Sequence, residues 1–152
     1  LAEDKLFATL DPTSRRLRFP TEMEVIITDT VGFIRNLPED LLKAFMATLE
    51  ELREADLLIH VIDVSSPCYQ DQMNVVEKFL KELDLENIPC LKVYNKVDLI
   101  KEELIGKINK EGGLLVSSLQ PDTLKPFLIQ AERLIGKVIG GGQGLRKNPN
   151  SF

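Results

Sequence analysis

Residues 57–98, LLIHVIDVSSPCYQDQMNVVEKFLKELDLENIPCLKVYNKVD, decide the fold class. The run at 57–63 is apolar nearly throughout, as a strand covered on both faces must be. The segment 69–83 repeats apolar residues at helical spacing, and 89–94 is a further buried strand. This βαβ order predicts an α/β fold with a mostly parallel, doubly wound sheet. The helix residues expected to face inward are Val75, Val76, Phe79, Leu80 and Leu83.

The segments on either side continue the alternation of strands and helices. In chain order, we expect an edge strand around 16–19, a strand at 24–29, a helix over 37–55, a helix around 101–110, a short strand at 114–117 and a last helix near 122–138. The glycine-rich segment 140–152 has no periodicity, which is typical of a linker or a frayed end. We therefore expect a domain at 1–139 and a flexible tail.

Composition excludes several classes of protein. The 152 residues suit one domain, and 43% hydrophobic with 28% charged residues is close to a globular average. A net charge of −5 disfavours unspecific coating of nucleic acid, and we expect no DNA partner. Two cysteines and one histidine are too few for a disulfide framework or a paired-histidine metal site. No apolar run is long enough to insert into a membrane, so we expect a cytoplasmic protein.

Polar motifs follow three of the expected strands. Because ligands of open α/β sheets bind beyond the carboxyl ends of the strands, we expect these motifs to converge on one side of the sheet. They are Asp29-Thr30-Val31-Gly32, Asn95-Lys96-Val97-Asp98 and Ser117-Ser118-Leu119.

The motif at 95–98 has the chemistry of guanine recognition. The Asp98 carboxylate can accept two parallel hydrogen bonds from the ring N–H and the exocyclic amine of guanine, donors that adenine lacks there. Lys96 would lay its aliphatic stem along the base, while Asn95 would bond a ring nitrogen and tie loops together. The alternative is a polar turn in which Asp98 caps the next helix.

The other two motifs are less specific. Asp29 can hold magnesium through a water, and Gly32 lets its backbone N–H approach a terminal phosphate. Backbone amides of 117–119 can contact the guanine carbonyl oxygen. Taken singly, each motif is equally an ordinary turn or loop.

Together, these motifs resemble those of the HflX family of ribosome-associated GTPases. Further likeness lies in LFATLDPT at 6–13, DTVGFIRNLP at 29–38, ATLEE at 47–51 and ADLL at 55–58. The resemblance covers about residues 3–139. It implies a P-loop NTPase-like (Ras-like) G domain that binds GTP or GDP with Mg²⁺.

The resemblance also implies roles for residues and partners. In the family, the segment Phe7, Ala8, Thr9, Leu10 and Asp11 is the first switch, and Thr9 joins Asp29 at the magnesium. The implied activity is GTP hydrolysis on the large ribosomal subunit, through ribosomal RNA and protein, in ribosome splitting or rescue. We expect a monomer.

A phosphate-binding loop, G-x-x-x-x-G-K-[ST], is not found in the 152 residues. We therefore expect a G domain that lacks this loop and the first strand, and that is inactive alone. By resemblance the missing strand is central. The strands at 24–29 and 57–63 would then pair directly, borrow a strand from another copy, or stay partly unfolded.

Two further features concern turnover and partners. Phe33 stands where many GTPases have a glutamine that orients the attacking water, so intrinsic hydrolysis should be slow. Arg15, Arg16 and Arg18 form a tight basic cluster, either a solvated face or a contact to RNA phosphates. Two alternatives to the GTPase are an interaction module that is defective in nucleotide binding and a flavodoxin-like receiver domain. The motif at 95–98 argues against the receiver domain, because such a domain does not recognise guanine.

Overall fold

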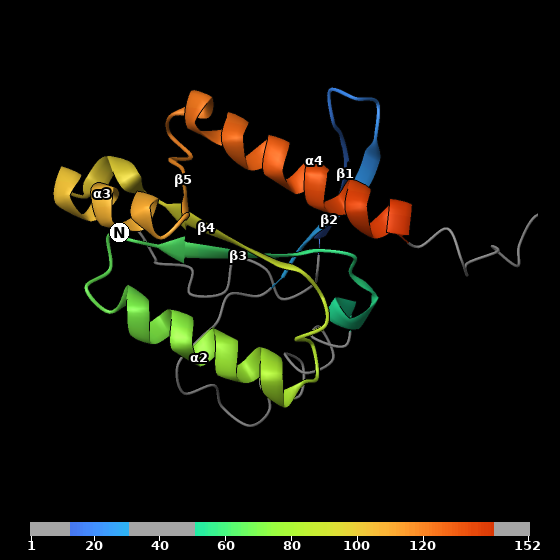
Figure 1. Cartoon of the computed structure of the whole chain (residues 1–152), viewed down its shortest axis with the longest axis horizontal. Coiled ribbons are helices and arrows are strands. Elements are labelled where there is room, and N and C mark those ends of the chain that lie inside the picture. The colour runs from blue at the N-terminus through green and yellow to red at the C-terminus, as the bar shows by residue number, and fades with distance from the viewer. Residues whose placement is uncertain (1–12, 31–50, 142–152) are drawn as a thin grey trace, which may run out of the picture. The chain divides into compact units, whose positions relative to one another are not determined.

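The computed structural model describes residues 13–30 and 51–141. Within these ranges the elements follow the order β1, β2, η1, β3, α2, β4, η2, α3, β5, η3 and α4, where η marks a 3-10 helix (Figure 1). Contacts divide the chain into two compact units, residues 1–55 and 56–152, and each is described by itself. The expected domain boundary after residue 139 stays a prediction.

An antiparallel hairpin forms most of the described part of the first unit. β1 (Thr13–Arg18) pairs with β2 (Glu24–Asp29), from Thr13 opposite Asp29 to Arg18 opposite Glu24. β2 has the expected bounds, whereas β1 begins at Thr13 rather than at 16. The helix expected over 37–55 lies largely outside the described residues, and its described end, η1 (Glu51–Glu54), is a 3-10 turn.

A parallel sheet forms the centre of the second unit. β3 (Leu58–Asp63), β4 (Cys90–Asn95) and β5 (Leu114–Leu115) lie in the order β3-β4-β5. The register places Asp63 opposite Asn95 and Tyr94 opposite Leu115. This sheet confirms the expected α/β class with parallel strands.

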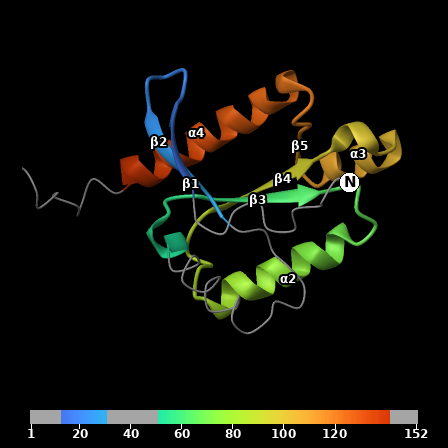
Figure 2. The same ribbon diagram turned by 180° about the vertical axis from the view of Figure 1, so that it is seen from behind.

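Helices cover both faces of this sheet. α2 (Tyr69–Glu82) and α4 (Leu124–Gly141) lie on opposite sides of it in both views (Figures 1 and 2). Ile62 and Tyr94 form a buried cluster with Ile108 of α3 (Glu102–Lys110), and Met73 of α2 packs against it. Because side chains alternate along a strand, Leu91 and Val93, also buried, belong to the opposite face. The core therefore has two layers, one on each side of the sheet.

Two expectations about the helices are wrong. No residue of α2 is buried, and Val75, expected to face inward, is 46% exposed because it lies off the stripe that packs on the sheet. The last helix does not stop near 138 but continues through Gly140 to Gly141, two residues assigned to the tail. Its start is preceded by the 3-10 turn η3 (Pro121–Thr123).

The end of α3 needs two glycines. Gly112 has a φ of 76°, and its N–H donates to the carbonyl of Asn109 at 3.0 Å. The N–H of Gly113 donates to the carbonyl of Ile108, also at 3.0 Å, which completes a Schellman motif. A β-carbon on Gly113 would lie 2.4 Å from Cγ2 of Ile108 and 2.8 Å from Cε2 of Tyr94. The turn into β5 therefore packs directly on the core.

One strand is left with an open apolar side. Among the described strands, β3 pairs only with β4, and β2 only with β1. Direct pairing of 24–29 with 57–63, one outcome expected of the chain alone, would join the two units and stays a prediction. Ile59 and Val61 of β3 are 37% and 61% exposed, so the expected cover of this strand on both faces is wrong at these two positions. None of the helices in the described ranges has the length and apolarity needed to cross a membrane.

Candidate guanine-nucleotide site

The loops that follow β3, β4 and β5 begin at one edge of the sheet. The N–H of Val64, just after β3, donates to the carbonyl of Asn95 at 3.2 Å. The N–H of Val116, just after β5, donates to the carbonyl of Tyr94 at 2.8 Å. The convergence that we expected of the motifs at 95–98 and 117–119 is therefore present.

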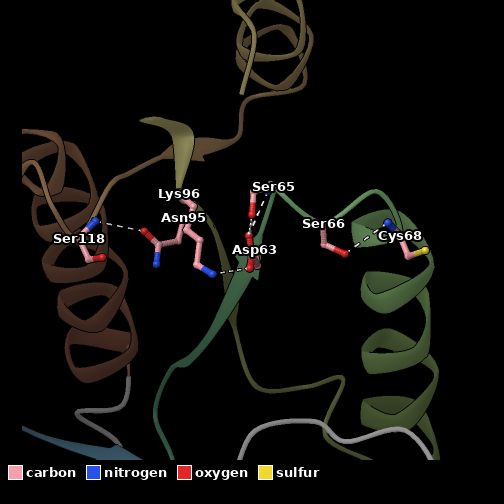
Figure 3. A network of polar contacts seen from close by, with 7 residues as sticks. All are labelled: Asp63, Ser65, Ser66, Cys68, Asn95, Lys96 and Ser118. Carbon is pink, nitrogen blue, oxygen red and sulfur yellow. Dashed lines mark hydrogen bonds and ion pairs between the residues drawn. The ribbon is translucent and has the colours of Figure 1, made fainter. Parts of the chain in front are cut away.

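Asn95 joins two of these loops. Its Oδ1 accepts a hydrogen bond from the backbone N–H of Ser118 at 3.2 Å (Figure 3). The N–H of Leu119 donates to Oγ of Ser117 at 3.3 Å. The N–H of Ser117 donates to Oγ1 of Thr123. All three amides that we expected to face a guanine carbonyl are thus engaged within the chain, and a ligand that uses them has to compete for them.

Asp98 is held by a buried hydroxyl. Oγ of Ser117 donates to Oδ1 of Asp98 at 2.5 Å, and Ser117 is fully buried. No side chain caps α3, whose N-cap residue is Lys101. The alternative in which Asp98 caps the next helix is therefore wrong, because its carboxylate points to Ser117 instead.

Thr123 fixes the backbone at Ser117. The Thr123 Oγ1 accepts from the N–H of Ser117 at 2.8 Å. The same hydroxyl lies 3.2 Å from the Ser117 carbonyl and 2.7 Å from the Gln120 carbonyl, as a donor. One side chain thereby sets the position of the residue that holds Asp98.

Lys96 adopts a backbone conformation that non-glycine residues rarely use. Its φ of 67° and ψ of 34° are left-handed, and it begins the 3-10 turn η2 (Val97–Leu99). Its Nζ lies 2.7 Å from Oδ2 of Asp63, the last residue of β3 (Figure 3). The lysine side chain therefore runs from the end of β4 to the end of β3.

Asp63 was not among the residues selected from the sequence. Burial raises the pKa of Asp63, but hydrogen bonds from Lys96 and Ser65 outweigh this effect and hold the pKa below its ordinary value. The signal was its position, because Asp63 ends an apolar strand next to the strand that ends at Asn95. Applying the strand-end rule to this strand as well would have found it.

The remaining predicted site residues belong to the first unit or lie outside the description. Asp29 ends β2 and is exposed, and Thr30 follows it half-buried. The positions Phe7, Ala8, Thr9, Leu10, Asp11, Val31, Gly32 and Phe33 lie outside the described residues. Among the residues that are described, no three histidine, cysteine or acidic side chains gather as a metal site.

The basic cluster does not form one surface. Arg15 alternates with Arg16 and Arg18 along β1, so it lies on the other face of the hairpin. Arg18 forms an ion pair with Glu22 in the turn. On the face that Arg16 shares with Arg18, at most Arg16 has its charge available to another molecule. This weakens the expectation that the cluster makes a dense contact to RNA phosphates.

The geometry at 95–98 and 117–119 suits recognition of a flat, hydrogen-bonding ring. A carboxylate, an amide side chain and a long aliphatic stem come from four consecutive residues at the carboxyl edge of the sheet. Each is held by a partner from another loop, so the groups are positioned in advance.

Comparison with known proteins agrees with this geometry. The family model described as "50S ribosome-binding GTPase" matches residues 1–96. "GTPase HflX" of Escherichia coli is 45% identical over 90% of this chain and 33% of that protein. The protein of the same name from Alkalihalophilus pseudofirmus is 42% identical over 89% of this chain and 32% of its own length. The one from Caldanaerobacter subterraneus is 60% identical over 65% of this chain and 23% of its length.

The chain thus spans about a third or less of the length of these curated relatives. Among solved structures, a crystal structure of an SsGBP variant superposes with a TM-score of 0.72, covering 88% of this chain and 50% of that one at 24% identity. That likeness extends the α/β assignment to a P-loop GTPase-like fold. The chain belongs to the 50S ribosome-binding GTPase family, and within it to the HflX GTPases.

Proposed function

We propose that the whole protein binds and hydrolyses GTP on the large ribosomal subunit, in ribosome splitting or rescue. In this proposal, residues 95–98 and 117–119 hold the guanine base. The observation that carries it is the hydrogen bond from Ser117 to Asp98, which holds the carboxylate of the motif at 95–98 in one orientation. The family model and the relatives named HflX support the activity and the partner.

Guanine selectivity follows from the acceptors of Asp98. A carboxylate has about four lone-pair sites, so the bond to Ser117 leaves acceptors for the ring N–H and the amine of guanine. Adenine would leave these acceptors unpaired, and sites of this kind discriminate by about 10⁴-fold or more. The Lys96 stem would cover one face of the base.

Magnesium would be held by Asp29 and Thr9. An exposed carboxylate at a strand end and a hydroxyl are oxygen donors of the kind that Mg²⁺ prefers. When bound, the ion would supply positive charge at the phosphates. With Phe33 in place of a water-orienting glutamine, we propose slow intrinsic hydrolysis that a ribosomal partner accelerates.

A second candidate function is an interaction module that does not hydrolyse GTP. The observation that favours it is the sequence itself, in which no phosphate-binding loop motif occurs among the 152 residues. In that case this chain by itself would show no GTP turnover, while its surfaces could still contact a ribosome or a protein.

Replacing Asp98 by Asn in the whole protein tests the proposal. We expect the variant to lose affinity for GDP and GTP and to gain preference for xanthine nucleotides, because an amide presents a donor where xanthine has a carbonyl. Titration with fluorescent GDP, XDP and ADP measures both changes. Unchanged guanine affinity would reject the assignment of Asp98.

A pelleting experiment tests the proposed binding to the large ribosomal subunit. The whole protein is sedimented with purified large subunits in the presence of a non-hydrolysable GTP analogue.

A further inference from the structure

The carboxylate of Asp63 has a protein partner on each oxygen. Oδ2 accepts from Nζ of Lys96 at 2.7 Å, and Oδ1 accepts from the N–H and Oγ of Ser65 at 3.0 and 2.6 Å (Figure 3). Its side chain is 40% exposed, so water could solvate it instead. Three protein donors therefore orient a group that solvation alone would leave free to turn.

The partner of Asp63 is Lys96, whose long side chain would not hold one orientation without a contact. A lysine side chain has four rotatable bonds and a compact charge, and unpaired it samples many rotamers. The left-handed backbone of Lys96 is a sparsely populated conformation, of the kind that persists where the surroundings fix it and that clusters at functional sites. The ion pair to Asp63 selects the rotamers in which the aliphatic stem spans the ends of β4 and β3.

A second ion pair in the same unit provides a comparison. Nζ of Lys92 on β4 lies 2.5 Å from Oε1 of Glu77 on α2, with each side chain 42% exposed. The Asp63–Lys96 pair is similarly accessible, at 40% and 47%. Ion pairs this exposed contribute little to stability, so stability does not account for Asp63 any better than for Glu77.

We propose that Asp63 is a positioning residue for guanine binding. By holding Nζ of Lys96, it fixes the lysine stem as a wall of the base site before the nucleotide arrives. The inference rests on the proposed function, since it assumes that guanine binds beside Lys96. Asp63 touches neither the base nor the phosphates and acts only through the lysine.

A double-mutant cycle in the whole protein tests this role. The variants are Asp63→Asn, Lys96→Met, their combination, and Glu77→Gln as the matched control. We expect Asp63→Asn to raise the dissociation constant for fluorescent GDP about 3- to 10-fold, the cost of ordering one long side chain on binding. The ratio of GDP to IDP affinity should stay unchanged, because Asp98 is intact. In the Lys96→Met background, Asp63→Asn should add less than about 2-fold, since Lys96→Met has already removed the charge on which Asp63 acts.

The possible results separate this inference from the proposed function. Glu77→Gln should leave GDP affinity unchanged. If Asp63→Asn also left GDP affinity unchanged, the inference would be overturned while the proposed function would stand. Full additivity of the two substitutions would also overturn it. If the unmodified protein showed no preference for GDP over ADP, the proposed function would be rejected, and the inference that rests on it would be rejected too. If the melting temperature of Asp63→Asn is well below that of Glu77→Gln, Ser65→Ala is used as the test variant in place of Asp63→Asn. We then expect a 2- to 3-fold loss of GDP affinity. No loss in that variant would reject the role.

Discussion

Ser117 and Asp98 are 19 residues apart in the sequence and are joined by a hydrogen bond of 2.5 Å between Oγ and Oδ1. The serine is fully buried, whereas the aspartate is exposed. A short bond from a hydroxyl to a carboxylate is charge-assisted and stronger than a neutral one. A group inside the protein thus sets the direction of a carboxylate on its surface.

Replacing Ser117 by Ala should weaken guanine-nucleotide binding about 10-fold, because a hydrogen bond to a charged group contributes about 1.5–3 kcal/mol. Calorimetric titration of the whole protein with GDP measures the loss. Ser118→Ala is the matched control, since Ser118 offers its backbone N–H and not its side chain to Asn95. Equal losses in the two variants would contradict the role of the Ser117 hydroxyl.

Replacing Thr123 by Val keeps the shape of the side chain and removes the hydroxyl that brackets Ser117. The N–H of Ser117 would then lack its acceptor, at a cost of about 1–3 kcal/mol. We expect a lower midpoint of urea unfolding together with weaker GDP binding. Thr123→Ser should restore both, and a variant that lost stability but kept full affinity would show that Thr123 does not act on the site.

Acidification should destabilise the protein through His60. Burial lowers the pKa of His60, and the positive charge of Lys92 lowers it further, while Glu77 partly opposes them. Because the folded pKa lies below the unfolded value of 6.5, the stability from the neutral imidazole is complete above pH 6.5 and falls as pH drops toward the folded pKa. Free energies of unfolding at pH 7.5 and 5.5 should therefore differ more in the unmodified protein than in His60→Asn. An equal difference would exclude His60 as the cause.

Replacing Gly113 by Ala should destabilise the second unit by about 1–3 kcal/mol, as expected of an overpacked core. The new β-carbon would lie 2.4 Å from Cγ2 of Ile108, which is 1% exposed, so core side chains would have to shift. Thermal unfolding measures the loss. Gly106→Ala is the control, since a β-carbon there meets nothing within 4 Å and alanine favours helix, so this variant should be neutral or stabilised.

The sequence predicted the strands of the sheet to within one or two residues at most ends, because short continuous apolar runs such as 57–63 and 89–94 favour strands. It also predicted that 95–98 and 117–119 would meet, because parallel strands end at a common edge. The inward orientation of Val75 failed because apolar spacing alone does not say how wide a stripe the sheet covers. The extension of α4 through Gly140 and Gly141 is not predictable from the sequence, because glycine disfavours the helix interior by about 1 kcal/mol relative to alanine.

Asp63 itself could have been selected by its place at a strand end, but its partner could not. Its bond to Lys96 joins residues 33 positions apart and depends on the register of β3 against β4. The conformation of Lys96 matters equally, because a left-handed residue redirects its side chain, and nothing in the letters N-K-V-D indicates a positive φ. Register and single-residue backbone geometry are set by the packed sheet.

The register of β3 on β4 makes ligand affinity a reporter of correct assembly. The same alignment that brings Ile62 beside Tyr94 in the core brings Asp63 beside Asn95 at the edge. A slip of one residue would turn the apolar side chains of β3 to the other face and would separate Asp63 from Lys96 at the same time. Molecules with the slipped register would therefore bind the ligand poorly. A ligand that binds only the correctly aligned form would stabilise that form and raise its share among refolding molecules.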